Sequence, residues 1–150
     1  MVTVGETYPP FSLHDQNAAT VGSSDVAGSW FLLYWYPKAD TPGCTAQAEG
    51  LRDQYEAFEE LGCQVYGASF DPPEVNAAFR ARYELPFRLL TDQTHELAVQ
   101  LGAATETASV PQRIAHLVDP SGIVVQRYEV DDPEFFAEHV LDDLEAIIAG

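Results

Sequence analysis

The run Trp30–Tyr36, seven consecutive apolar and aromatic residues, is the feature that most restricts how this 150-residue chain can fold. A run without polar alternation is typical of a strand that is buried on both faces, as in α/β proteins. It is also far shorter than the roughly 20 residues that a membrane-spanning helix requires. The chain must therefore cover both faces of a sheet built around this strand.

Helical spacing follows this run. Apolar residues recur at intervals of three and four, as on one face of a helix that ends before Gly62; they are Ala48, Leu51, Tyr55 and Phe58. A second helix, from about residue 71 to 83, is expected to bury a similar set: Val75, Ala78, Phe79 and Tyr83. The alternation continues and predicts strands at residues 63–69, 87–90, 114–118 and 123–128, and helices at 95–101 and 133–148.

These elements predict an α/β fold, with a mixed central sheet and helices on both faces. Residues 1–150 are expected to form one domain, since this length is typical of a single compact unit. Most strands alternate with helices, which is the order found in parallel sheets. The turn-forming segment Asp119–Gly122 joins two strands directly and predicts a late antiparallel hairpin.

Acidic side chains greatly outnumber basic ones. The sequence has 24 Asp and Glu residues against seven Lys and Arg, a formal net charge of −17 at pH 7. Such a charge repels phosphate backbones and anionic lipids, so we expect neither a nucleic-acid partner nor a membrane partner. The acids either keep an ordinary protein soluble or adapt it to a salty cytoplasm, and the presence of only one lysine, Lys38, favours adaptation. The N-terminus lacks the pattern of a signal peptide, and we expect a cytoplasmic protein.

Cys44 is the residue whose position best predicts chemistry. It follows Gly43 at the first turn of the predicted helix and at the carboxyl end of the buried strand, where open α/β sheets bind ligands. Unpaired N–H groups and the helix dipole favour a thiolate there, and the thiolate is the nucleophilic form of cysteine. A buried structural cysteine is the alternative. The residues before Cys44 argue against it, because Pro37, Thr41 and Pro42 describe a constrained polar turn.

The residues before Cys44 resemble the active-site signature of peroxiredoxins, Pro-x-x-x-Thr-x-x-Cys, which runs here from Pro37 through Thr41 to Cys44. The stretch 36–45 most resembles the bacterioferritin-comigratory-protein subfamily, also called the Q type. Segments 67–71, 89–95 and 110–122 resemble later parts of the same family in the same order. The resemblance covers most of the chain and implies a thioredoxin-like domain of the AhpC/TSA type.

The resemblance implies a role for each matching residue. Cys44 would be the peroxidatic cysteine that attacks the O–O bond, and Thr41 would hydrogen-bond the thiolate and the peroxide through its hydroxyl. Pro37 would shield the sulfur from water. Arg113 would stabilise the thiolate and hold the substrate with a permanently charged, planar group. Gln47 matches a polar position that supports the peroxide in relatives, or it is simply an exposed helix residue.

A resolving cysteine is missing where many Q-type relatives carry one, five residues after the peroxidatic cysteine. That position is Glu49 in this chain, and residues 73–83 also lack a cysteine. Cys63 is predicted to begin the next strand, roughly 25 Å away along a helix that rises ~1.5 Å per residue. A disulfide needs Cα atoms within about 7 Å of each other. We therefore expect Cys63 to be a small buried residue and Cys44 to act without an intramolecular partner.

Other kinds of site find little support in the sequence. The four histidines do not have the spacing of metal ligands, so no metal site is expected, and His116 is expected to be a packed or exposed strand residue. No Gly-rich phosphate loop indicates a nucleotide cofactor. A pairing of Cys44 with a histidine for acyl transfer stays open, but no specific pattern favours it.

The prediction for function is a thiol-dependent peroxidase that needs no cofactor. Cys44 would reduce hydrogen peroxide or an alkyl hydroperoxide and become a sulfenic acid. An external thiol would then restore it: thioredoxin, glutaredoxin with glutathione, or another low-molecular-weight thiol. The alternative is a redox sensor or binding module whose sulfenic acid signals to a partner without turnover. The resemblance implies a monomer or a weak homodimer.

Overall fold

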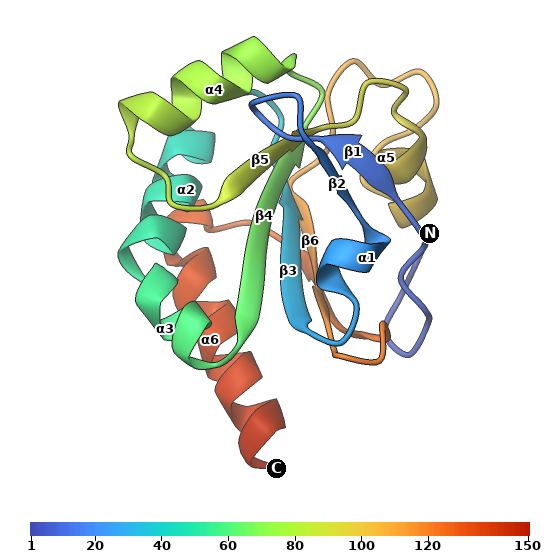
Figure 1. The fold of residues 1–150 in the computed structure, drawn as a ribbon, viewed down its shortest axis with the longest axis vertical. Coiled ribbons are helices and arrows are strands. Elements are labelled where there is room, and N and C mark those ends of the chain that lie inside the picture. Colours follow the sequence, from blue (N-terminus) through green and yellow to red (C-terminus); the bar gives the residue numbers. More distant parts are fainter.

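A seven-stranded sheet forms the centre of the structure, a computed structural model that describes residues 1–150 (Figure 1). The strand order is β2-β1-β5-β4-β3-β6-β7. The strands are β1 Ser12–His14, β2 Thr20–Gly22, β3 Trp30–Trp35, β4 Cys63–Ser69, β5 Arg88–Thr91, β6 Ile114–Val118 and β7 Val124–Glu129. β4 pairs parallel with β3 and β5, whereas the other neighbours pair antiparallel. The predicted mixed sheet and its late hairpin are confirmed.

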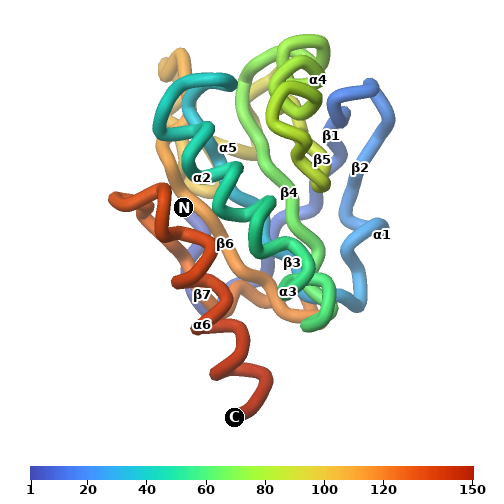
Figure 2. Tube along the Cα trace, turned by 90° about the vertical axis from the view of Figure 1, so that its left-hand side faces the viewer, coloured from blue at the N-terminus to red at the C-terminus, as the bar shows by residue number.

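Helices cover both faces of this sheet (Figures 1 and 2). They are α1 Ser23–Val26, α2 Pro42–Asp53, α3 Tyr55–Glu60, α4 Pro73–Arg82, α5 Glu96–Leu101 and α6 Phe136–Ala149, with a short 3-10 turn, η1, at Pro133–Phe135. α2, α3, α4 and α6 pack on one face, and α1 and α5 pack on the other. No helix combines the length and the apolar character needed to span a bilayer.

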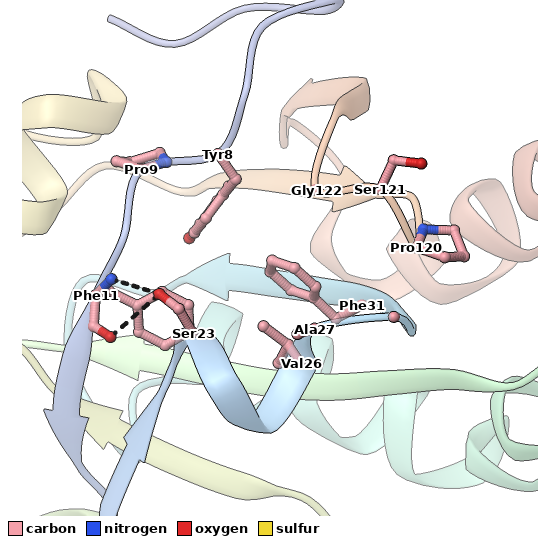
Figure 3. A pocket seen from close by; sticks show the side chains of 11 residues that line it. Tyr8, Pro9, Phe11, Ser23, Val26, Ala27, Phe31, Pro120, Ser121 and Gly122 are labelled. Atoms are coloured by element: carbon pink, nitrogen blue, oxygen red, sulfur yellow. Dashed lines mark hydrogen bonds between the residues drawn. The ribbon is translucent and has the colours of Figure 1, made fainter.

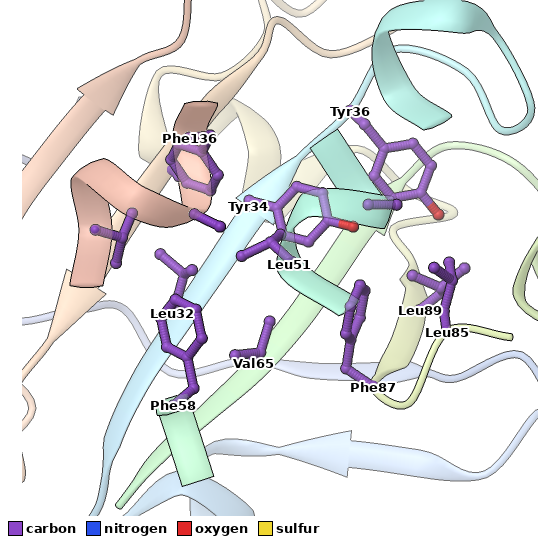
Figure 4. Close-up of a cluster of buried hydrophobic side chains, with 14 of the residues drawn as sticks. Leu32, Tyr34, Tyr36, Leu51, Phe58, Val65, Leu85, Phe87, Leu89 and Phe136 are labelled. Atoms are coloured by element: carbon purple, nitrogen blue, oxygen red, sulfur yellow. The ribbon is translucent and has the colours of Figure 1, made fainter. Parts of the chain in front are cut away.

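The two faces of β3 explain its unbroken apolar sequence. Successive side chains of a strand point to opposite sides. Leu32 and Tyr34, with Tyr36 just beyond the strand, are fully buried in the cluster under α2 (Figure 4). Leu33 and Trp35 are fully buried in the cluster on the other side. Each residue of the strand therefore has a core to fill, as the sequence predicts.

The helix predicted between the loop and Gly62 is divided in the structure. α2 ends at Asp53, and Gln54 leaves helical geometry with φ −102° and ψ 6° before α3 begins. The chain tightens at this point, because Ala57 N donates to Gln54 O three residues earlier at 3.0 Å. The prediction of one continuous helix is therefore wrong, because two helices form and Gln54 separates them.

The buried face of α4 also differs from the prediction. Val75 and Ala78 are exposed, whereas Asn76 is fully buried. The side chain of Asn76 accepts a hydrogen bond from Tyr36 Oη at 2.6 Å and donates to Thr91 Oγ1 at 3.3 Å. A polar side chain can be buried when its hydrogen bonds are satisfied. An apolar pattern does not reveal such pairing. The prediction is therefore wrong for Val75 and Ala78, whereas Phe79 is buried and Tyr83 packs against the same cluster, as predicted.

Most of the acidic side chains have no ionic partner. Ion pairs engage five of the 24 acids: Asp15, Asp40, Glu49, Asp53 and Glu129. The remaining carboxylates repel one another across the surface, which destabilises the folded chain at low ionic strength.

Salt should therefore stabilise the fold if its acidity is an adaptation to a salty cytoplasm. We expect the unfolding temperature to rise steadily from low salt to molar potassium chloride, because the Debye length falls to ~3 Å at 1 M. Circular dichroism melts across that range measure the effect. An unfolding temperature that is constant or falls would leave ordinary solubilising acidity as the explanation.

Candidate active site

Cys44 lies in the first turn of α2, at the carboxyl end of β3. Thr41 is the N-cap residue and Pro42 is the first helical residue, where its missing N–H costs no hydrogen bond. The first N–H groups of a helix lack intrahelical acceptors, and they form the positive end of its dipole. This turn carries no acidic residue. The backbone therefore favours negative charge at the Cys44 sulfur, at the location that the sequence predicts.

Arg113 brings a permanent positive charge to this sulfur. It lies directly before β6, the antiparallel neighbour of β3, and so reaches the same edge of the sheet as Cys44. Its Nη1 lies 3.5 Å from Cys44 Sγ and donates to Gln47 Oε1 at 3.0 Å. The guanidinium stays protonated at any physiological pH. The fold thus joins a thiol, a cation and an amide from segments almost 70 residues apart.

Gly43 makes room for the guanidinium. A Cβ at this position would lie 2.9 Å from Arg113 Nη2, closer than Cβ atoms approach other groups. It would also meet Pro133 Cγ of η1 at 3.9 Å. The glycine next to the reactive cysteine therefore has a steric role that sequence analysis did not identify.

Gln47 is fully buried, which corrects the alternative that it is an exposed helix residue. It follows Cys44 by three residues and points into the same site. Its Oε1 accepts the bond from Arg113, but its Nε2 has no partner. Buried amide groups are rarely left unpaired. Gln47 therefore keeps an unpaired donor, on a side chain that shares the Nη1 group of Arg113 with the sulfur.

Tyr34 is a second buried donor that sequence analysis missed. Its hydroxyl has no hydrogen-bond partner, and the side chain packs within the cluster of Figure 4. The pKa of Tyr34 is raised well above its ordinary value. Burial has the largest effect, and the nearby Tyr36 and Cys44 add to it. The phenol therefore stays protonated and able to donate. The alternation of side-chain direction along β3 could have identified Tyr34, because it turns this side chain toward the face of the sheet that α2 covers.

Thr41 and Pro37 lie in the turn as predicted, but the hydroxyl of Thr41 does not contact the sulfur. Its Oγ1 donates to Lys38 O at 2.7 Å, within the same turn. The bond to the thiolate that the resemblance implies is absent from the structure. The hydroxyl oxygen keeps lone pairs that can accept a hydrogen bond. Pro37 is half-buried, and Cys44 itself is only 1% exposed.

Cys63 lies at the opposite end of the sheet. It pairs with Trp30 at the start of β3, whereas Cys44 follows the end of that strand. The length of β3 alone separates the two ends by roughly 20 Å. Burial raises the pKa of the Cys63 thiol to about 12, and its Sγ donates to Gln64 O at 3.5 Å. The prediction of a small buried cysteine is confirmed.

The remaining histidine and acid positions offer no competing site. His116 is fully buried, and burial lowers its pKa to about 4. It is a packed residue, with Nε2 3.3 Å from Val2 O. No three His, Cys, Asp or Glu side chains come together as metal ligands do.

Figure 3 shows the residues that line a small hollow of about 190 Å³, away from Cys44. Tyr8, Phe11 and Phe31 are among the residues that line it. Phe31 is the second residue of β3, so the hollow faces the start of the strand whose other end leads to Cys44. No cysteine lines it, and so it is not the site of the thiol chemistry.

Comparison with known proteins agrees with this geometry. Residues 4–127 match the model of the AhpC/TSA family. Peroxiredoxin Bcp of Escherichia coli (strain K12) is 37% identical over 145 residues, which cover 93% of this chain and 85% of the relative. The chain belongs to the AhpC/TSA family. The predicted resemblance to peroxiredoxins of the Bcp and Q type is thereby confirmed.

Solved structures place this peroxiredoxin in the thioredoxin-like fold that the resemblance implies. Peroxidoxin BcpB from Mycobacterium tuberculosis aligns with a TM-score of 0.91 at 27% identity, over 98% of this chain and 99% of that one. The bacterioferritin comigratory protein of Xanthomonas campestris, studied for alkyl peroxide reduction, aligns with a TM-score of 0.84 at 25% identity, over 91% and 90%. The chain is accordingly an enzyme of the thiol peroxidase class.

Proposed function

We propose that Cys44 reduces hydrogen peroxide and alkyl hydroperoxides by a one-cysteine mechanism, with an external thiol as the reductant. The contact of 3.5 Å between Cys44 Sγ and Arg113 Nη1, at the start of α2, carries this proposal. The alkyl peroxide reduction studied in the Xanthomonas campestris relative supports the substrate class. The distance to Cys63 supports the need for an external thiol.

The residues around Cys44 supply a hydrogen-bond partner for each part of a peroxide. Arg113 has N–H groups beyond those that contact Cys44 and Gln47, and these can hold a peroxide oxygen. Gln47 Nε2 and Tyr34 Oη are buried donors without partners. Thr41 Oγ1 can accept the proton of the peroxide O–H while it donates to Lys38 O. We assign Pro37 the role of limiting access of water to the sulfur.

The oxidative step is a displacement at oxygen. The thiolate of Cys44 attacks the terminal peroxide oxygen, an S–O bond forms, and the O–O bond breaks with its electron pair on the leaving oxygen. That oxygen takes a proton and departs as water or alcohol. Cys44 becomes a sulfenic acid. The N–H groups of Arg113, with the amide of Gln47 beside them, stabilise the charge that develops on the leaving oxygen.

The reductive step needs two thiol equivalents from outside the chain. The first thiol attacks the sulfenic sulfur and releases water, which leaves a mixed disulfide on Cys44. The second attacks that disulfide and restores the Cys44 thiol. A dithiol such as thioredoxin supplies both equivalents, and so do two molecules of a small thiol. Cys63 does not take part, because its thiol stays protonated and lies at the other end of the sheet.

One equivalent of peroxide should produce a Cys44 sulfenic acid that a sulfenic-specific reagent traps. We expect Cys63 to remain a free thiol in the same sample, and excess peroxide to oxidise Cys44 further to sulfinic acid. Intact-mass analysis followed by peptide mapping measures both results. Cys63→Ser should leave turnover with an external thiol within about twofold of the wild type.

Two outcomes would contradict this mechanism. A stoichiometric Cys44–Cys63 disulfide that forms at the rate of turnover, within or between chains, would replace it with a two-cysteine mechanism. Absence of steady-state peroxide consumption with every thiol donor would favour a redox sensor, in which the sulfenic acid persists and signals to a partner.

For the assembly and location of the protein, we keep the expectations drawn from the sequence. We infer a monomer or weak homodimer in the cytoplasm, with thioredoxin, glutaredoxin with glutathione or another small thiol as the reductant. Mass measurement in solution and the rates with each thiol donor test these expectations.

A further inference from the structure

Asp40, in the turn before α2, has a backbone conformation that few residues with a side chain adopt. Its φ is +62°, in the left-handed region. Aspartate tolerates this region better than most residues, but the conformation persists only where the surroundings hold it. Asp40 directly precedes Thr41, the N-cap residue of α2, and lies four residues before Cys44. A change in its backbone would therefore move the reactive turn.

Two consecutive residues at the end of α4 hold the carboxylate of Asp40. Arg82 Nη1 donates to Oδ2 at 2.7 Å, and Tyr83 Oη donates to Oδ1 at 2.7 Å. Both bonds lower the pKa of Asp40, and the bond from Tyr83 has the larger effect. Both oxygens of an ionised carboxylate are thus used. We call these three residues the Asp40 clamp.

Tyr83 also reaches the far side of the reactive turn. Its carbonyl oxygen accepts a hydrogen bond from Arg52 Nη1 of α2 at 2.8 Å. Just before the turn, Ala39 N donates to Asp71 Oδ2 at 2.9 Å. Hydrogen bonds therefore connect the segments before and after Cys44 to the region between β4 and the end of α4.

The exposure of the Asp40 clamp argues against a role in global stability. The side chain of Asp40 is 37% exposed and that of Arg82 is 65% exposed. Water and salt weaken ion pairs at such positions, so they add little to the free energy of unfolding. Two directed bonds to one carboxylate nevertheless fix the orientation of a residue with an unusual φ. The clamp therefore acts on local geometry.

We propose that Asp40 is a positioning residue, held by Arg82 and Tyr83, that keeps Cys44 within reach of Arg113. This inference rests on the proposed function of Cys44. Arg113 is fixed separately, directly before β6, so movement of the turn changes the distance between Cys44 Sγ and the guanidinium. Loss of the clamp frees the backbone of residue 40, so Cys44 is no longer held beside Arg113. The cation then no longer stabilises the thiolate, and attack on peroxide slows.

Substitutions of Asp40 in the full chain test this role. Asp40→Ala and Asp40→Gly remove the carboxylate, and glycine also accepts positive φ without strain. Asp40→Asn keeps an acceptor for Tyr83 and tolerates the left-handed region. Tyr83→Phe removes one bond of the clamp, and Asp142→Ala removes an exposed charge on α6 as the control.

The first readout is the rate at which iodoacetamide alkylates reduced Cys44 between pH 5 and pH 9, which requires no peroxide. The second is kcat/KM for hydrogen peroxide. We expect Asp40→Ala and Asp40→Gly to lower the alkylation rate at pH 7 about fivefold and kcat/KM about tenfold, and Tyr83→Phe to lower both about threefold. Asp40→Asn keeps the bond from Tyr83 but loses that from Arg82, so it should lose no more than Tyr83→Phe does. Asp142→Ala should stay within about twofold of the wild type, and unfolding temperatures within a few degrees.

Asp40→Gly decides the question if Asp40→Ala does not fold. Alkylation and kcat/KM within about twofold of the wild type in Asp40→Gly would overturn the proposal. It would also fail if any loss merely followed the fraction of unfolded protein in circular dichroism. A wild type that consumes no peroxide would refute the proposed function, whereas the alkylation rates would still decide whether the clamp positions Cys44.

Discussion

Cys44→Ser is expected to abolish peroxide reduction, with a loss in kcat/KM of at least about a thousandfold. Serine keeps the size of the side chain, but its hydroxyl does not ionise near neutral pH and does not form a sulfenic acid. The fold should persist, because Arg113 can donate to the serine oxygen as it does to the sulfur. The substitution therefore removes the nucleophile alone.

Steady-state consumption of hydrogen peroxide with an excess of thiol donor measures this loss. Cys63→Ser is the matched control, since it makes the same change at the other buried cysteine, and circular dichroism checks folding in both variants. Activity of Cys44→Ser within about threefold of the wild type would remove Cys44 from the mechanism.

The sequence predicted the central strands well, because buried strands leave a strong pattern. The predicted strands 63–69 and 114–118 agree with β4 and β6 at both ends. β1 and β2 were not predicted, because three residues carry too little alternation for a pattern to emerge. Their formation depends on pairing with β5 and with each other, which are tertiary contacts.

The site was predictable where it depends on local chain direction. The location of Cys44 followed from one strand leading into one helix, and the position of Arg113 followed from the family resemblance. The burial of Gln47 could have been found from spacing, since it follows Cys44 by three residues and precedes Leu51 by four. Spacing alone did not show that its amide pairs with Arg113.

Contacts between distant segments account for what sequence analysis missed. Asn76 is buried because Tyr36, 40 residues earlier, donates a hydrogen bond to it. Asp40 adopts positive φ beside Arg82 and Tyr83, more than 40 residues later. An apolar pattern assigns Asn76 to the surface, and it gives no sign that the exposed Asp40 has these partners. Only the three-dimensional arrangement shows these bonds near the turn before Cys44.

Arg113→Ala is expected to lower kcat/KM for peroxide about a hundredfold, the size of effect seen when a fixed donor is lost beside developing charge. The variant removes the cation 3.5 Å from Cys44 Sγ and the only protein donor to Gln47 Oε1. The alkylation rate of Cys44 near neutral pH should fall as well, since a nearby cation favours the thiolate. Unchanged rates in both assays would mean that Arg113 has no role in the reaction.

Arg113→Ala should also lower the stability of the fold, and this effect must be separated from its effect on the reaction rate. It leaves the buried amide of Gln47 without any partner, which costs about 1–3 kcal/mol of stability. Arg113→Lys keeps the charge, but an ammonium group lacks the planar fork that reaches two acceptors, so we expect an intermediate rate.

Gly43→Ala tests the geometry of this contact while the charge stays in place. The new Cβ would lie 2.9 Å from Arg113 Nη2, so the guanidinium has to shift, and its position relative to the sulfur changes. Gly50→Ala is the matched control in the same helix, because its Cβ would lie 3.4 Å from Glu134 O and 4.0 Å from Ala137 Cβ. Both changes raise helix propensity, and therefore differ mainly in what happens to Arg113. We expect Gly43→Ala to lose about tenfold in kcat/KM and Gly50→Ala to stay within about twofold; equal rates would show that catalysis does not depend on where the guanidinium lies.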